Sequence, residues 1–144
     1  MNVKQIEAKD TYPIRSVVLR PGLPKETCHF AGDHDEHTFH LGAFEDNQLV
    51  SIASFYFVKN PQIQNNYQYQ LRGMATLEQH RAQGLSSALL RTAFPIIKNN
   101  HVDLLWCNAR KEAQGFYEKV GFKTISEEFQ IEGVGPHFLM TKDI

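Results

Sequence analysis

Residues 81–86 read Arg81-Ala82-Gln83-Gly84-Leu85-Ser86, and they separate a strand-like run at 67–76 from a strongly helical one. The side chains that recur at helical spacing after this stretch are Leu85, Ala88, Leu89, Thr92 and Ala93. Gly84 lets the backbone approach a ligand closely, and the first turn of a helix presents unpaired N–H groups at the positive end of its dipole. The stretch therefore predicts a turn that binds a phosphate group.

The residues of this turn do not identify which phosphate-containing ligand binds. No Gly-Lys-Ser or Gly-Lys-Thr follows, as a P-loop requires, and the three-glycine fingerprint of dinucleotide-binding folds is missing. The Ser86 and Ser87 hydroxyls suit either a bond to phosphate or ordinary capping of the helix. Taken alone, the turn indicates anion binding by one of several folds.

A second block of sequence narrows the choice. After a strand-like run at 102–108, the chain reads Ala113-Gln114-Gly115-Phe116-Tyr117-Glu118-Lys119-Val120-Gly121-Phe122, in which Gly121 suits a helix C-cap. An Arg-x-x-Gly-x-small turn between a strand and a helix, followed by a strand and then Ala-x-x-Phe-Tyr-Glu-Lys-Val-Gly-Phe, resembles the GNAT superfamily of acyl-CoA-dependent N-acyltransferases. The resemblance covers residues 38–143.

This resemblance implies an α+β fold built on one twisted, mostly antiparallel sheet. The sheet would have six to seven strands with a splay between the fourth and fifth, flanked by three to four helices. The implied reaction moves an acetyl group from acetyl-CoA to a primary amine by direct attack in a ternary complex. Two alternatives remain: a CoA-binding module without turnover, and a metal-binding regulatory protein that uses the histidine-rich segment 29–40.

The resemblance also assigns residues to acetyl-CoA. The strand backbone at 71–76 would pair with the pantetheine arm, and the turn would bind the pyrophosphate with help from the Arg81 guanidinium. Arg110 stands where many members carry an Asn that bonds the cofactor arm, so it is a possible contact to the cofactor or to an acidic substrate, or a solvent-facing side chain. The expected cofactor-binding residues are Met74, Ala75, Thr76, Arg81, Ala82, Gln83, Gly84, Leu85, Ser86, Ser87 and Asn108.

Tyr117 is the expected general acid. Its helical spacing with Phe116 and Val120 by itself favours a core tyrosine. A tyrosine at this place in GNAT enzymes, however, commonly protonates the departing thiolate, and a phenol with a pKa of about 10 is protonated at neutral pH.

His137 is the first candidate for the general base, because it follows a glycine-rich turn in a late hairpin and an imidazole titrates near neutrality. A structural histidine bonded to the turn backbone is the alternative. No motif fixes the base in this superfamily, so Glu78, Glu128 and Glu132 stay open.

Histidines crowd one segment of the chain. The residues concerned are His29, His34, His37 and His40, beside Asp33, Asp35 and Glu36. The spacing of these histidines would suit a metal ion only on a helix, whereas the segment reads as a loop that enters a strand. We therefore expect no metal, and a polar loop that lines the acceptor pocket is the other possible role.

Composition sets the remaining expectations. A length of 144 residues with 42% hydrophobic content suits one domain over 1–144, and a net charge of −1 gives no reason to expect nucleic acid. The chain has neither a membrane-spanning run nor the hydrophobic region of a signal peptide, so we expect a cytoplasmic protein. Its two cysteines, Cys28 and Cys107, should be reduced. Homodimers are common in the superfamily, but no residue here identifies an interface or the acceptor amine.

Hydrophobic periodicity and turn residues predict the order of elements. The expected order is a strand at 2–7, a helix at Thr11–Arg20, a hairpin of 38–44 and 49–57, a strand at 67–76, a helix at 84–98, a strand at 102–108, a helix at 111–120, and strands near 122–131 and 137–142. Pro13 should fall in the first turn of its helix, and Pro95 should cause a kink or an early end.

Overall fold

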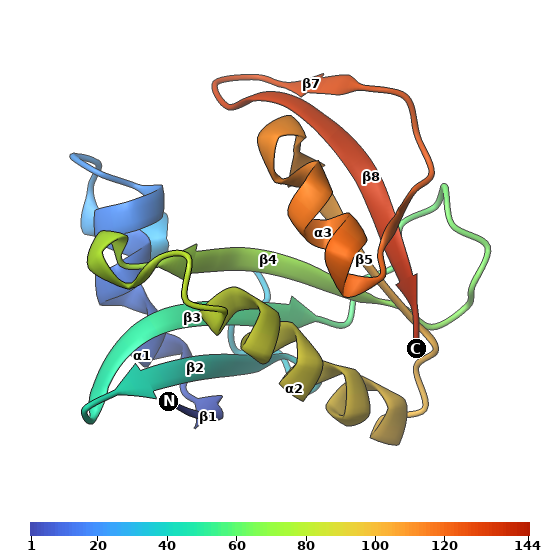
Figure 1. Ribbon diagram of the computed structural model, residues 1–144. Helices are drawn as coiled ribbons and strands as arrows, with labels where there is room; N and C mark the ends of the chain where they lie inside the picture. The colour runs from blue at the N-terminus through green and yellow to red at the C-terminus, as the bar shows by residue number, and fades with distance from the viewer.

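One eight-stranded sheet runs through the protein, whose computed structural model describes residues 1–144 (Figure 1). The strands are β1 (Asn2–Ile6), β2 (Phe39–Glu45), β3 (Gln48–Tyr56), β4 (Tyr69–Thr76), β5 (Leu104–Arg110), β6 (Lys123–Thr124), β7 (Phe129–Ile131) and β8 (Gly135–Asp143). The helices are α1 (Ala8–Ile14), α2 (Leu85–Asn99) and α3 (Gln114–Val120). Shorter turns are a π-helical turn at Arg15–Leu19 and 3-10 turns at Lys25–Cys28, Glu78–His80 and Lys111–Ala113.

The strand order is β1-β2-β3-β4-β5-β8-β6, and β7 pairs with β8 beside that path. Every pair is antiparallel except β4 with β5. This confirms the mixed, mostly antiparallel sheet. It has eight strands because the region near 122–131 forms two short strands, β6 and β7, instead of one.

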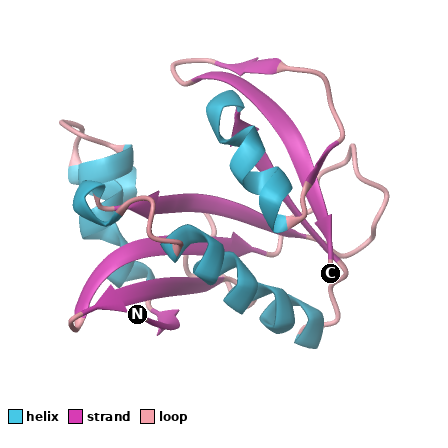
Figure 2. Ribbon diagram, viewed as in Figure 1, coloured by secondary structure: helices cyan, strands magenta, loops and turns pink.

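Helices cover both faces of the sheet (Figure 2). The larger hydrophobic core lies between the sheet and helices α2 and α3, and it includes Leu71, Leu89 and Tyr117. A smaller cluster of Ile14 and Ile52 with Ala75 lies under α1, on the opposite face. Each strand in the middle of the sheet therefore sends alternate side chains toward α2 and toward α1.

The parallel pair β4 and β5 parts soon after it begins. Only Tyr69 with Leu105 and Gln70 with Trp106 are paired, although β4 continues to Thr76 and β5 to Arg110. In Figure 1, the half that contains β5, α3 and β8 swings away from β2, β3 and β4. The predicted splay between the fourth and fifth strands is confirmed, and it leaves two facing strand edges without partners.

A β-bulge reshapes β4 beside this gap. Ile52 pairs with Ala75 and Ser54 pairs with Arg72, so Gly73 and Met74 together face a single residue of β3. Gly73 has a φ of +65°, and a Cβ added there would lie 3.0 Å from a ring carbon of Phe30. Only glycine combines that backbone with such a close approach.

Helix α1 differs from the prediction at both ends. It begins at Ala8 instead of Thr11, because the Asp10 carboxylate accepts a hydrogen bond of 2.9 Å from the Glu7 N–H and so caps the first turn. Pro13 consequently lies inside the helix, where it removes one hydrogen bond. The chain then widens into a π-helical turn, in which the Arg20 N–H donates to the Arg15 carbonyl over 2.9 Å.

The sequence predicted a kink or an early end of helix α2 at Pro95; the helix does not end there but continues to Asn99. Pro95 is exposed, and so is Arg91, whose carbonyl loses its partner and can turn to water instead. The buried face with Leu89, Ala93 and Ile97 holds the helix on the sheet. None of the helices combines the length and the apolar character needed to cross a membrane.

The remaining elements match the prediction closely. The hairpin of β2 and β3 turns on Asp46 and Asn47, both with positive φ, as a two-residue turn requires. Gly121 ends α3 in a left-handed conformation with a φ of +105°. The first turn expected in that helix is the 3-10 segment Lys111–Ala113. Both cysteines are free and buried.

Candidate active site

A cleft of about 1090 Å³ opens where β4 and β5 part, and it is the larger of the two pockets described here. It extends from the start of α2 to the β7–β8 hairpin and is lined by residues of both strands. Among the expected site residues, only Gln83 does not line it. The splay therefore brings together two motifs that lie far apart in the sequence.

The two faces of the sheet present different side chains to this cleft. Leu71 and Cys107 belong to the core under α2 and α3. Their neighbours Arg72 and Asn108 therefore point to the opposite face, which is the face of α1. Arg110 lies two residues beyond Asn108 on β5 and pairs in register with His137 of β8, so these side chains share that face.

The turn at 81–86 has the backbone of an anion site. Ala82 and Gly84 both adopt left-handed conformations, with φ of +61° and +80°, and a Cβ added to Gly84 would meet only open space. The N–H groups of Leu85, Ser86 and Ser87 open helix α2, and none donates to an acceptor within the protein. Unpaired donors at the positive end of a 15-residue helix fit a phosphate.

The side chains around this turn are tied to β4. Ser86 Oγ lies 3.2 Å from Thr76 Oγ1, and the Arg81 Nε donates to the Thr76 carbonyl over 3.2 Å. Gly84 is the N-cap, and no side chain caps the helix, so the capping alternative for Ser86 is wrong. The two remaining nitrogens of the Arg81 guanidinium make no hydrogen bond within the protein.

Two further cations that line the cleft were missed from the sequence. Arg91 lies one helical turn after Ser87, and its Nε donates to the Ser87 hydroxyl over 3.2 Å. Lys119 of α3 lines the same cleft from the other side. The spacing of four between Ser87 and Arg91 could have revealed the first, whereas nothing in the sequence points to Lys119.

Tyr117 lies on α3 with its ring in the core and lines the cleft. Its ring packs edge-on against Phe116 and Phe122 at centroid distances of 5.1 and 5.2 Å, and its hydroxyl makes no hydrogen bond within the protein. Burial raises its pKa well above the ordinary value, with a further contribution from Cys107 nearby. The phenol therefore stays protonated at neutral pH and keeps its proton available to a ligand.

His137 lies across the gap, on β8. Its Nδ1 donates to the Gly135 carbonyl over 2.8 Å, because a carbonyl oxygen only accepts. This bond occupies Nδ1 and leaves Nε2 without a hydrogen-bond partner in the protein. The turn bond that the sequence offered as the structural alternative is thus present, and it leaves the ring able to accept a proton.

The acidic alternatives for the base lie elsewhere. Glu78, Glu128 and Glu132 do not line the cleft, and Glu128 forms an ion pair of 2.8 Å with Lys111.

Cys107 lines the cleft but is only 2% exposed. Burial raises the pKa of its thiol, so this thiol is a poor nucleophile.

A buried ion pair anchors the loop that precedes β2. Arg15 and Asp33 form two parallel hydrogen bonds of 2.7 and 3.0 Å, and Tyr56 donates to Asp33 over 2.6 Å. Burial alone would raise the pKa of Asp33, but the bonds from Arg15 and Tyr56 lower it to about 2. Asp33 also accepts a 2.9 Å bond from the Phe30 N–H, which holds that residue at the cleft.

One histidine of the histidine-rich segment, His40, belongs to this anchor. His40 is 4% exposed and bonded to Ser54 and to the Asp33 carbonyl at 2.6 and 3.0 Å, and burial lowers its pKa. His29 stacks on Tyr12, and His37 packs against Phe57. No group of three His, Cys, Asp or Glu side chains in residues 1–144 could hold a metal ion. The segment reaches the cleft through Phe30, and none of its histidines lines it.

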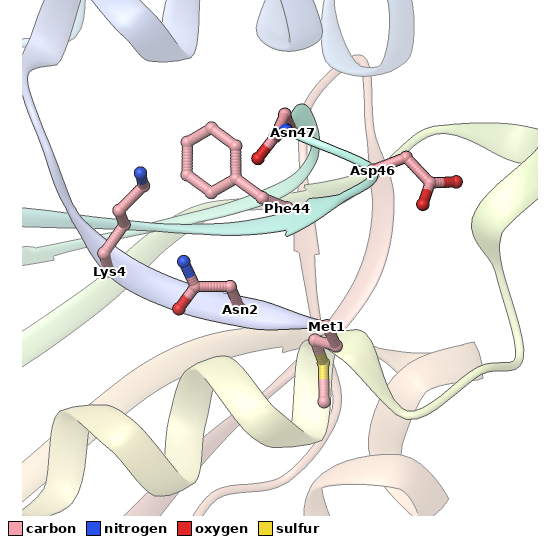
Figure 3. Close-up of a pocket in the computed structure, with 6 residues that line it drawn as sticks. All are labelled: Met1, Asn2, Lys4, Phe44, Asp46 and Asn47. Atoms are coloured by element: carbon pink, nitrogen blue, oxygen red, sulfur yellow. The ribbon is translucent and has the colours of Figure 1, made fainter.

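A second pocket, of about 310 Å³, lies at the far edge of the sheet, against β1 and the β2–β3 hairpin (Figure 3). Its lining residues are Met1, Asn2, Lys4, Phe44, Asp46 and Asn47. The Lys4 ammonium lies 4.6 Å from the centre of the Phe44 ring. The pocket holds neither a paired acid and base nor a helix N-terminus.

Known proteins are similar to this chain both in sequence and in fold. A family model described as an acetyltransferase (GNAT) domain matches residues 24–144. The chain is also 43% identical over 144 residues to the protein named uncharacterized N-acetyltransferase YitI of Bacillus subtilis (strain 168). That match covers 100% of this chain and 97% of the relative.

Solved structures share the fold of this chain at lower sequence identity. The ribosomal-protein-S18-alanine N-acetyltransferase of Escherichia coli matches with a TM-score of 0.77 at 20% identity, covering 99% of this chain and 93% of that one. An aminoglycoside 6'-N-acetyltransferase complexed with coenzyme A matches with a TM-score of 0.73 at 10% identity, covering 99% and 97%. These two likenesses show the fold, and the family model with the 43% identical relative shows the family. The chain belongs to the GNAT family of acetyltransferases.

Proposed function

We propose that this protein transfers an acetyl group from acetyl-CoA to a primary amine by direct attack within a ternary complex. The observation that carries the proposal is the gap between β4 and β5, which has an unpaired helix N-terminus at one end and Tyr117 with His137 on either side. The relative bound to coenzyme A shares this fold.

The chain offers acetyl-CoA a set of groups that fits its chemistry. The free N–H groups at the start of α2, with Arg81 and Arg91, suit the phosphates. The free edge of β4, through Met74 to Thr76, suits the amides of the pantetheine arm as an added strand would. When bound, acetyl-CoA supplies a thioester carbonyl that an amine can attack.

Protein groups would then manage charge and protons. His137 Nε2 accepts a proton from the attacking amine, and a backbone N–H on the β4 edge stabilises the oxyanion. The Tyr117 hydroxyl donates its proton to the departing sulfur, which thereby leaves as a thiol. The raised pKa and burial of Cys107 argue against an acetylated cysteine intermediate and support direct attack.

Release of free thiol from acetyl-CoA in the presence of a panel of primary amines tests the proposal. An amine-dependent release above the rate of hydrolysis is the expected result. A rise in melting temperature with CoA and no release with any amine would favour the alternative of a CoA-binding module without turnover.

Replacing Gly84 by glutamate should weaken acetyl-CoA binding by about 100-fold, which corresponds to about 2.7 kcal/mol. The new carboxylate would enter the open space beside the free N–H groups and repel the phosphates. Isothermal titration with acetyl-CoA measures the effect.

Gly133→Glu is the matched control. Gly133 has a φ of +78°, close to the +80° of Gly84, and its Cβ would also meet open space. The two variants should therefore share the same backbone strain. Equal acetyl-CoA affinity in both would move the phosphate site away from this turn.

A further inference from the structure

Two arginine side chains converge on one aromatic ring of the cleft, on the face of the sheet that α1 covers. The guanidinium carbons of Arg20 and Arg72 each lie 5.1 Å from the centre of the Phe30 ring, and that of Arg72 lies 5.3 Å from the Tyr56 ring. Both side chains are half-buried and both line the cleft. Stacking on aromatic rings orients a guanidinium without neutralising its charge.

The anchor beneath the ring explains why these arginines are held there. Asp33 fixes the Phe30 backbone, and the buried Arg15 guanidinium stacks on the ring at 3.9 Å. Gly73 has no side chain, which leaves room for the ring against β4. Phe30 is therefore a rigid platform for Arg20 and Arg72.

No carboxylate balances these charges. The cleft lining contains no Asp or Glu, and neither Arg20 nor Arg72 forms an ion pair. Asp33 is already engaged by Arg15 and Tyr56. Arg110 adds a third cation on the same face of the sheet. The chain as a whole has a net charge of −1, so the excess of positive charge is local.

The phosphates of the donor do not account for this cluster. Arg72 follows Leu71, whose side chain lies in the core under α2, so Arg72 points to the face opposite the phosphate-binding turn. Arg81 and Arg91 already supply cations at that turn. Arg20 spends one bond of 3.1 Å from Nη1 on the Leu19 carbonyl, and its other N–H donors and those of Arg72 are free to bind a different anion.

We propose that the acceptor amine carries an anionic group, either a carboxylate or a phosphate, which binds to Arg20 and Arg72 with Arg110 nearby. The inference rests on the proposed function, because it names the acceptor of that reaction. A guanidinium presents paired N–H donors that match the oxygens of both groups. Polycationic acceptors are excluded by repulsion.

The positive charges of these arginines would also favour deprotonation of the acceptor amine. Nearby cations lower the pKa of a bound ammonium group, because like charges disfavour the charged form. An amine held near Arg72 and Arg110 would lose its proton more readily and reach the thioester as the neutral nucleophile, with His137 on the same face to accept that proton. Anion recognition and activation of the amine thus come from one cluster.

Matched pairs of acceptors test the inference. β-Alanine is compared with propylamine, phosphoethanolamine with ethanolamine, and a set of amino acids with their carboxamides. The anionic member of the preferred pair should have a kcat/KM at least tenfold higher, and the pairs distinguish carboxylate from phosphate. Turnover of neutral and anionic members at equal kcat/KM would overturn the inference and leave the proposed function standing.

Single substitutions test whether Arg20 and Arg72 cause the preference for anionic acceptors. Arg72→Gln and Arg20→Gln should each reduce the preference for the anionic acceptor about tenfold, as loss of a charge-assisted hydrogen bond does. The KM for acetyl-CoA should stay unchanged in both. Arg91→Gln is the control on the donor side: it should raise the KM for acetyl-CoA and keep the acceptor preference. Arg72→Gln with an unaltered preference would contradict the assignment.

A binding measurement separates this inference from the proposed function. In saturating CoA, β-alanine and phosphoethanolamine should raise the melting temperature of the wild type and of Arg91→Gln but not of Arg72→Gln. That pattern without thiol release would support the anion site and defeat the acetyltransferase proposal. No stabilisation of the wild type by either anion, nor by any of the amino acids, would overturn the anion site.

Discussion

Replacing Tyr117 by phenylalanine should lower kcat by about 100-fold or more while leaving the Kd for acetyl-CoA unchanged. The substitution removes only the hydroxyl, which makes no hydrogen bond within the protein, and the ring keeps its packing against Phe116 and Phe122. Without the phenol, the departing sulfur must leave as a thiolate. Steady-state kinetics with acetyl-CoA and the preferred amine, together with CoA titration, measure both quantities.

Tyr69→Phe is the matched control for this variant. Tyr69 is 1% exposed, and burial raises its pKa as it does for Tyr117. Its hydroxyl, however, donates to the His37 carbonyl over 2.7 Å and does not face the cleft. Tyr69→Phe should therefore lose about 1 kcal/mol of stability and keep its kcat. A Tyr117→Phe protein as active as Tyr69→Phe would leave Tyr117 as a packing residue.

Replacing Asp33 by asparagine should lower the free energy of unfolding by about 3–5 kcal/mol. Arg15 is fully buried, and the substitution leaves its charge without a counterion while removing an acceptor for Arg15 and Tyr56. Urea denaturation at pH 7 measures the loss. The double variant Arg15→Met with Asp33→Leu is the control, because it removes both charges and should recover part of the stability.

The same variant should respond differently to acid. Asp33 has a folded pKa of about 2, below its ordinary value of 3.8, so its contribution to stability is present above pH 3.8 and is lost as the pH falls through about 2. The difference in stability between the wild type and Asp33→Asn should shrink over that range. A constant difference from pH 5 to pH 2 would contradict the assigned ionisation of Asp33.

The turn and the helix proposed to hold acetyl-CoA could be predicted from the sequence. Gly84 and the residues around it form one local turn, and its geometry depends on neighbours in the chain. Tyr117 and Gly121 fall in a motif of ten residues. Local signals of this kind survive in a single sequence, because helix starts and C-caps are determined by adjacent residues.

The acceptor half could not be predicted, because its members meet only through tertiary contacts. Arg20 and Phe30 reach the cleft because a π-helical turn and the Arg15–Asp33 pair position them. The histidine-rich segment suggested a metal or a pocket wall, but only His40 is buried and bonded to the anchor, and Phe30 alone of the segment lines the cleft. Aromatic and charged side chains in a loop carry no period from which their destination could be read.

By itself, the sequence of this protein determined the order of strands and helices and the turn at 81–86 that opens α2, since each depends on local spacing along the chain, whereas the role proposed for Tyr117 came from the family resemblance. The tertiary structure decided where β4 and β5 part, which face each side chain takes, and which charges lack a partner. The bulge at Gly73, the register of β4 and the buried ion pair set those features, and each joins segments that are far apart in sequence.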